Sequence, residues 1–477
     1  TCVLSQGALL CAGSGGSGRL GSPDVTTASV PVPVGYVQRQ GGWHGERFMQ
    51  LSMYHSHACA VALSGSLWCW GAGASGRLGT GGTDNEALPQ QVNPSNWQVL
   101  VPNGVAQVSA GSEHTCAILR SSSLWCWGKG ENGRLGIGSS SESNVPAHVQ
   151  NDAWGSGSGL MGVARVSAGA AHTCAVLADG TLWCWGSNGD GRLGIGSSPG
   201  SANSPEQVGQ VQWGSGGSQD MVVDVQAGVR HSCAIEQGGA LWCWGDNEQG
   251  QVGTVLAWTG PARVFSAAFL QTGVVAVSTG AEHTCAVLVT GQLFCWGQAQ
   301  HGRLGGGSST GIVPSPQEVT GLTDVVSVSA GYRHTCATRV DGSLWCWGQG
   351  SDGRLGHGDT TSSTVPRQAW HFLQTPLHVC WRFHPALHSE LTGVVVGPAS
   401  ALSQPLCPDA PTAALPSWTA QLRIPNAQPS AGPSWQHSAE IVKQLLSDRW
   451  PFDPAIPPFR GAGLPECYAT VRRCRRP

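Results

Sequence analysis

Charged residues are scarce in this 477-residue sequence. Only 11% of the residues are Asp, Glu, Lys or Arg, against about 25% in a typical soluble domain. The net charge is −3, so the chain has no overall basic field that would attract nucleic acid. It also lacks any apolar run of about 18 residues, and we expect no membrane span.

The motifs of common active sites are missing as well. No Ser-His-Asp order, no paired carboxylates and no cofactor fingerprint stand out, so we expect no enzyme, no catalytic residue and no cofactor. The sequence Gly-Arg-Leu-Gly-Ile-Gly at 133–138 resembles a phosphate-binding glycine loop. However, the segment has near-copies along the chain, lacks the Gly-Lys-Ser/Thr of a phosphate-binding loop, and is not followed by a predicted helix. We therefore predict a structural turn.

What the sequence does have is a repeat. The stretch at 171–186, with His-Thr-Cys-Ala and Leu-Trp-Cys-Trp-Gly, returns in altered form along the chain. A unit of this size cannot bury its own core and packs on its neighbours. The first copy lacks its opening strand and His, so we interpret the sequence as partial, with a signal peptide neither confirmed nor excluded. The first cysteines of the copies lie 51 to 59 residues apart: Cys2, Cys59, Cys116, Cys174, Cys233, Cys285 and Cys336.

Each unit contains a predicted β-hairpin. In the fourth copy, strands at 173–177 and 181–186 flank the loop Ala178-Asp179-Gly180. The third loop residue needs a left-handed backbone, and Gly occupies that place in five of the six full copies, with Ser122 as the exception. In the first copy, a two-residue turn at Gln6-Gly7 keeps the same facing cysteines.

Two further strands complete the unit. An apolar strand precedes the hairpin, as at 163–169, and a Pro-led strand follows it, as at 205–208. Seven units of four strands, without helical periodicity, predict an all-β fold, a seven-bladed β-propeller over residues 1–370.

Over roughly residues 1–370, the chain resembles the repeat of the regulator of chromosome condensation family. The motifs that carry this resemblance are Gly-x-x-His-Thr-Cys-Ala, Asp-Gly-x-Leu-Trp-Cys-Trp-Gly and Gly-Arg-Leu-Gly. The resemblance implies a seven-bladed propeller. It says little about function, because that family includes a Ran exchange factor, ubiquitin-ligase domains, a plant ultraviolet photoreceptor and a β-lactamase inhibitor. The photoreceptor's Gly-Trp-Arg-His-Thr is missing here, and Gly331-Tyr332-Arg333 comes nearest to it.

Fourteen of the eighteen cysteines form seven facing pairs. Facing hairpin positions have the Cβ separation that a disulfide needs, so we predict seven disulfides. Two alternatives stay open, namely reduced buried thiols and a metal site in which His172 joins Cys174 and Cys184. Disulfides imply an oxidising compartment, extracellular or lumenal. The pairs are Cys2 with Cys11, Cys59 with Cys69, Cys116 with Cys126, Cys174 with Cys184, Cys233 with Cys243, Cys285 with Cys295, and Cys336 with Cys346.

A histidine recurs at one position of each full unit. Because it is present in every such unit, we predict a packing or hydrogen-bonding role for it rather than catalysis. These residues are His57, His114, His172, His231, His283 and His334.

The composition changes after about residue 370. Residues 371–477 are rich in Pro and lose the repeat, so we expect them to be mostly disordered. Within them we predict a helix at 438–449 and a strand at 391–396, which resembles 322–327 and would close the ring by completing the first unit. The basic end at 472–476 is interpreted as a solvated tail. The pairing of Cys380, Cys407, Cys467 and Cys474 is left open.

Two functions fit these observations. The first is a non-catalytic binding scaffold for a protein or glycan, with specificity set by loops on a rigid ring. The second, from the resemblance alone, is an exchange factor for a small GTPase or another cytosolic regulator. For the scaffold, we predict a ligand on the unit-to-unit connections of the first four units; the alternative is that the Trp in each connection folds back over its own blade edge. These residues are Trp43, Trp97, Trp154 and Trp213.

Overall fold

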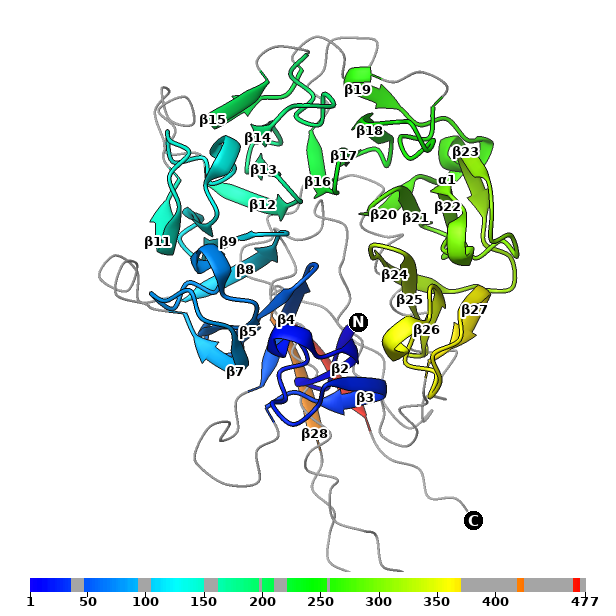
Figure 1. The fold of residues 1–477 in the computed structure, drawn as a ribbon. Coiled ribbons are helices and arrows are strands. Elements are labelled where there is room, and N and C mark those ends of the chain that lie inside the picture. The colour runs from blue at the N-terminus through cyan, green and yellow to red at the C-terminus, as the bar shows by residue number, and fades with distance from the viewer. Residues whose placement is uncertain are drawn as a thin grey trace, which may run out of the picture. The chain divides into compact units, whose positions relative to one another are not determined.

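The chain folds into a ring of seven β-sheets (Figure 1). The computed structural model describes residues 1–35, 47–92, 104–149, 162–196, 200–209, 221–254, 258–369, 418–423 and 466–471. The chain divides into two compact units, Thr1–Arg382 and Phe383–Pro477, and the ring belongs to the first. Each sheet of the ring is one antiparallel blade, which confirms the predicted seven-bladed propeller.

In each blade the strands run in chain order from the ring axis to the rim (Figure 1). Blades 2 to 7 begin with an innermost strand: β4 (Phe48–Met53), β8 (Val105–Ala110), β12 (Val163–Ala168), β16 (Val222–Ala227), β20 (Val274–Thr279) and β24 (Val325–Ala330). The second strands, starting with blade 1, are β1 (Cys2–Ser5), β5 (His57–Ala62), β9 (His114–Leu119), β13 (His172–Leu177), β17 (His231–Glu236), β21 (His283–Leu288) and β25 (His334–Arg339).

The third and fourth strands complete the blades. The third strands are β2 (Ala8–Ser14), β6 (Leu67–Gly71), β10 (Leu124–Gly128), β14 (Leu182–Ser187), β18 (Leu241–Gly245), β22 (Leu293–Gln298) and β26 (Leu344–Gly348). The rim strands are β3 (Thr27–Pro33), β7 (Glu86–Gln91), β11 (Ser143–His148), β15 (Ser201–Gln207), β19 (Trp258–Arg263), β23 (Ile312–Glu318) and β27 (Ser363–Gln368). Among the described residues, blade 1 therefore has three strands and the other six blades have four.

The hairpin turns have the backbone conformations that the sequence predicts. Gly180 has a φ of +80°, and Ser122, which replaces Gly in the third unit, has a φ of +65°. The shorter first turn has positive φ at both Gln6 and Gly7, the geometry that a two-residue hairpin turn requires. The strand register is consequently the same in every blade.

This register brings the predicted cysteine pairs together. In blade 4, Cys174 lies opposite Cys184, and in blade 1 Cys2 lies opposite Cys11. Each of the seven predicted pairs is disulfide-bonded in the structure. The metal alternative at His172 is excluded, because Cys174 and Cys184 are bonded to each other.

The rim strand of blade 4 differs from its prediction. The strand β15 covers Ser201–Gln207, whereas the sequence predicts a strand that begins at Pro205. The pairing of β14 with β15 shifts between Cys184 and Gly186, so Pro205 lies in a bulge. A bulge on a rim strand tolerates Pro because no ladder hydrogen bond is needed there. Pro therefore does not mark the start of this strand.

The core of the ring lies between the blades. Trp185 of blade 4 is fully buried in a cluster with Cys116, Cys126, Leu135 and Val149 of blade 3. The equivalent Trp of blades 3, 5 and 7 packs in the same way on the disulfide face of the preceding blade. We call each contact between consecutive blades a joint.

Replacement of Trp185 by Ala is expected to lower the free energy of unfolding by about 3 to 5 kcal/mol, because it leaves a cavity in the joint between blades 3 and 4. Trp185→Phe keeps most of the packing, and we expect a loss of about 1 to 2 kcal/mol for that variant. Urea unfolding monitored by circular dichroism measures both. A loss below about 1 kcal/mol for the Ala variant would show that this ring does not support the joint.

Outside the blades, the structure describes one short helix and one strand pair. The helix α1 (Ala267–Thr272) lies between blades 5 and 6. In the second unit, β28 (Trp418–Arg423) pairs antiparallel with β29 (Glu466–Val471), which the sequence analysis does not predict. The strand predicted at 391–396 and the helix predicted at 438–449 lie outside the described residues.

Candidate functional site

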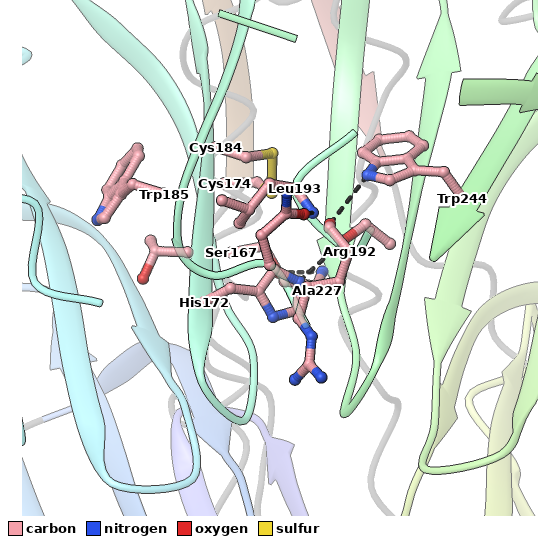
Figure 2. Close-up of a disulfide and its surroundings, with 12 residues drawn as sticks. Ser167, His172, Cys174, Cys184, Trp185, Arg192, Leu193, Ala227 and Trp244 are labelled. Carbon is pink, nitrogen blue, oxygen red and sulfur yellow. Dashed lines mark hydrogen bonds between the residues drawn. A yellow bond between two sulfur atoms is a disulfide. The ribbon is translucent and has the colours of Figure 1, made fainter. Parts of the chain in front are cut away.

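The repeated Gly-Arg-Leu-Gly segment forms part of the joint rather than a ligand site. The main-chain carbonyl of its Arg accepts a hydrogen bond from the indole of the next blade, as Figure 2 shows for Arg192 and Trp244. The final Gly makes room for that indole, since a Cβ at Gly136 would lie 2.6 Å from Trp185 Nε1. Six indoles, 2.9 to 3.2 Å from their acceptors, follow this rule, with a Gln in place of one Arg: Trp70 to Arg19, Trp127 to Arg77, Trp185 to Arg134, Trp244 to Arg192, Trp296 to Gln251, and Trp347 to Arg303.

The recurring histidines also belong to the joints. His57 Nε2 lies 2.8 Å from the Thr115 hydroxyl of the next blade. That hydroxyl donates its own proton to the Arg77 carbonyl, so it must accept a hydrogen bond from the protonated Nε2. The other five histidines make the same bond: His114 to Thr173, His172 to Ser232, His231 to Thr284, His283 to Thr335, and His334 to Thr1.

Burial keeps these imidazoles neutral. Burial is the main cause that lowers the pKa of His57, His231 and His334 to about 3, and nearby positive charges contribute to this lowering. The pKa values of His114, His172 and His283 are lowered well below the usual range for the same reason. With Nε2 bonded to a hydroxyl and the ring buried, these histidines are not available as catalytic bases.

A cavity of about 690 Å³ lies beside blade 1. Leu4 of β1, Met53 of β4 and Val326 of β24 contribute apolar surface to its lining, and Tyr54 and Tyr332 contribute two phenols. Burial raises the pKa of Tyr54, which keeps its hydroxyl protonated at neutral pH. No Asp or Glu is among the described residues that line the cavity. This lining can bind a ligand but lacks the carboxylates of acid–base catalysis.

The other predicted sites have separate outcomes. The four tryptophans of the predicted ligand arc, Trp43, Trp97, Trp154 and Trp213, lie outside the described residues, so the arc stays a prediction. In the described part of the chain, no three His, Cys, Asp or Glu side chains gather as a metal site would require. Nor does this part contain a helix with the length and apolar character needed to cross a bilayer.

Sequence reasoning missed the partners of the histidines. Five of the six hydroxyl partners directly follow the next unit's His, as Thr173 follows His172, and the sixth is Thr1. Every partner lies more than 50 residues from the imidazole that it binds. The signal was present, because a Thr or Ser follows each His except His57, where Ala58 occurs. Only the blade-to-blade geometry shows which His meets which hydroxyl.

Comparison with known proteins agrees with this architecture. The ultraviolet-B receptor UVR8 of Arabidopsis thaliana is 30% identical over 371 residues, which cover 76% of this chain and 78% of the receptor. The human E3 ubiquitin-protein ligase HERC2 is 30% identical over 356 residues, but these cover 73% of this chain and only 7% of the ligase.

Solved structures show the same fold. Prp20p from Saccharomyces cerevisiae superimposes with a TM-score of 0.63 at 19% identity, over 76% of this chain and 86% of Prp20p. Human WBSCR16 superimposes with a TM-score of 0.64 at 20% identity, over 76% of this chain and 95% of WBSCR16. The family model described as the RCC1-like domain matches residues 2–383. The chain therefore belongs to the RCC1-like domain family.

Proposed function

We propose that the chain is a non-catalytic binding scaffold that works in an oxidising compartment, extracellular or lumenal. The proposal rests on one observation: the repeated polar residues make their hydrogen bonds inside the joints, between blades. In most units the histidine, hydroxyl and arginine are bonded within the joints, as for His114, Thr173 and Arg134. What such a ring offers to a partner is its loops and its cavity.

The disulfides support the choice of compartment. Both sulfur-bearing residues of each bridge are buried in blades 2 to 6, with exposures of 0 to 1%. Disulfides persist in oxidising compartments and are rare in the cytosol, where thiols are kept reduced. Relatives of this chain include a receptor and an E3 ligase, so the family supplies the propeller while the partner depends on surface residues. The arc of Trp43, Trp97, Trp154 and Trp213 stays a predicted ligand site.

Peptide mapping without reduction is expected to find Cys116 linked to Cys126, and likewise for each blade. The protein is alkylated as it leaves its native source, digested, and analysed by mass spectrometry before and after reduction. A bacterial cytosolic preparation, alkylated in the same way, is the control for oxidation during handling. Free thiols throughout the native protein would contradict the proposal and favour the cytosolic regulator, such as an exchange factor for a small GTPase.

A further inference from the structure

The joint between blades 5 and 6, joint 5–6, lacks a hydrogen bond that four other joints have. In those joints, a Ser on one innermost strand accepts a hydrogen bond at 2.9 Å from the next innermost strand, as Ser167 does from the N–H of Ala227 (Figure 2). By strand register, Gln226 occupies the place of this Ser in blade 5. Among the described residues, no hydrogen bond links Gln226 to β20. The other three pairs are Ser52 with Ala110, Ser109 with Ala168, and Ser278 with Ala330.

Joint 5–6 also lacks the bond that the Arg of Gly-Arg-Leu-Gly makes. In the same four joints, this Arg donates to a main-chain carbonyl in the turn after the next innermost strand, as Arg192 does to Val229 at 3.0 Å. Blade 5 has the shorter Gln251 at this position, and its side chain is fully buried. The Nε2 of Gln251 has no hydrogen-bond partner among the described residues. Because water would bond this amide in an opened joint, the amide favours the open state. The other three bonds are Arg77 to Ser112, Arg134 to Ala170, and Arg303 to Tyr332.

The contacts that remain in joint 5–6 are all non-covalent. It keeps the His231 bond and the indole bond, in which Trp296 donates to the Gln251 carbonyl at 3.0 Å. Gln298 also donates to Gln249 across the joint at 2.6 Å. Each of the seven disulfides lies within one blade, so none of them crosses a joint. The blades are therefore braced covalently, whereas the joints can open without breaking a covalent bond.

The helix α1 packs on joint 5–6 through a single side chain. Phe269 is the only buried residue of α1, and it belongs to the apolar cluster that contains Trp296 and the bridge between Cys233 and Cys243. Its ring meets the Phe294 ring edge-on, with the ring centroids 5.4 Å apart. The other five full units have Trp at the position of Phe294, so the smaller ring leaves room for Phe269. An aromatic contact from the connection thus takes the place of the missing polar bonds.

We propose that joint 5–6 is the first interior joint of the ring to open, and that α1 is the clasp that keeps it closed. The interior joints are those between blades 2 and 6. Local opening is easiest where the fewest contacts must break, and joint 5–6 lacks two repeated hydrogen bonds and depends on Phe269 instead. Opening separates two intact blades, so the loops of blades 5 and 6 change their spacing. This inference is independent of which partner those loops bind.

The indole N–H groups report the opening of each joint separately. Each one is buried and donates to the preceding blade, so it exchanges its hydrogen with heavy water only when that joint opens or the whole ring unfolds. In the full chain with its disulfides intact, the Trp296 indole is expected to exchange about ten-fold faster than those of Trp185 and Trp244. Proton–nitrogen correlation spectra, recorded at intervals after transfer into heavy water, measure the rates. Equal rates for the three indoles would overturn the proposal.

Variants of α1 separate the clasp from general stability. Phe269→Ala is expected to speed exchange of the Trp296 indole by a further ten-fold or about that, and to leave the Trp185 rate within about two-fold. Phe269→Leu keeps most of the apolar contact and should have a smaller effect of the same kind. Leu270→Ala is the matched control, because Leu270 is exposed on the same helix, and it should change neither rate. Equal acceleration of both indoles by Phe269→Ala and Phe269→Leu would overturn the role of the clasp.

The missing Ser bond is tested by restoring it and by removing its counterpart. Gln226→Ser places a hydroxyl where it can accept the N–H of Thr279, and it is expected to slow exchange of the Trp296 indole by about five-fold. Ser167→Ala removes the equivalent bond from joint 4–5 and is expected to speed exchange of the Trp244 indole by about the same factor. Both substitutions lie on innermost strands, away from the strands that carry the indoles. A Trp296 rate that Gln226→Ser does not change would contradict the proposed cause of opening.

Discussion

Reduction of the seven disulfides is expected to unfold the propeller at neutral pH. Each bridge closes a loop with a sequence separation of 9 or 10 residues, and the chain-entropy model assigns about 2 to 3 kcal/mol to a loop of this size. Together the seven contribute more than the roughly 5 to 15 kcal/mol of net stability that is usual for a folded protein. Urea unfolding with and without a phosphine reductant, monitored by Trp fluorescence, measures the loss.

A single-bridge variant is the matched control. Cys2→Ala combined with Cys11→Ala removes only the bridge of blade 1, and we expect it to fold with a loss of about 2 to 3 kcal/mol. The buried bridges are reached by the reductant through local opening, so reduction is carried out in urea before refolding. An unchanged unfolding midpoint for the fully reduced chain would contradict the prediction.

Acidification is the second condition expected to unfold the ring. The pKa of His57, His231 and His334 is about 3 in the folded chain and about 6.5 when unfolded. Because the folded pKa is the lower one, the unfolded chain binds more protons between these values. Stability is fully present above about pH 6.5 and falls as the pH decreases toward 3. At pH 5, protonation of these three histidines in the unfolded chain lowers the free energy of unfolding by roughly 6 kcal/mol in total. His114, His172 and His283 lower it as well.

The structural reason is a nitrogen that has no acceptor for a second proton. Nδ1 of His172 is buried without a hydrogen-bond partner among the described residues, so an added proton there would be unsatisfied. Urea unfolding at a series of pH values gives the slope of the free energy of unfolding against pH. His172→Gln is expected to reduce that slope by one proton, whereas replacement of the partly exposed His301 is expected to change it less. A free energy of unfolding that stays constant from pH 7 to 5 would rule this account out.

The sequence predicts best what is decided within one hairpin. The pairing of Cys174 with Cys184 follows from a three-residue loop, and the left-handed Gly180 follows from the turn geometry. The sequence does not predict the start of β15, because Pro205 lies in a bulge and a bulge leaves no local signal in the sequence. Predictions therefore fail first on the rim strand, where pairing is irregular.

The joints were harder to predict than the hairpins. The recurrence of His172 indicates a structural role, but its Ser232 partner comes from the next blade.

The indole bonds of the joints all run in the same direction around the ring, from one blade to the Arg or Gln carbonyl of the blade before it. The series stops at blade 1, where Ala12 occupies the place of the Trp. The joints are therefore not all equal. For its stability, the propeller behaves as a linear array of repeats whose two ends touch, rather than as a closed circle of equal joints. An array of this kind opens by fraying at its ends, here blades 1 and 7.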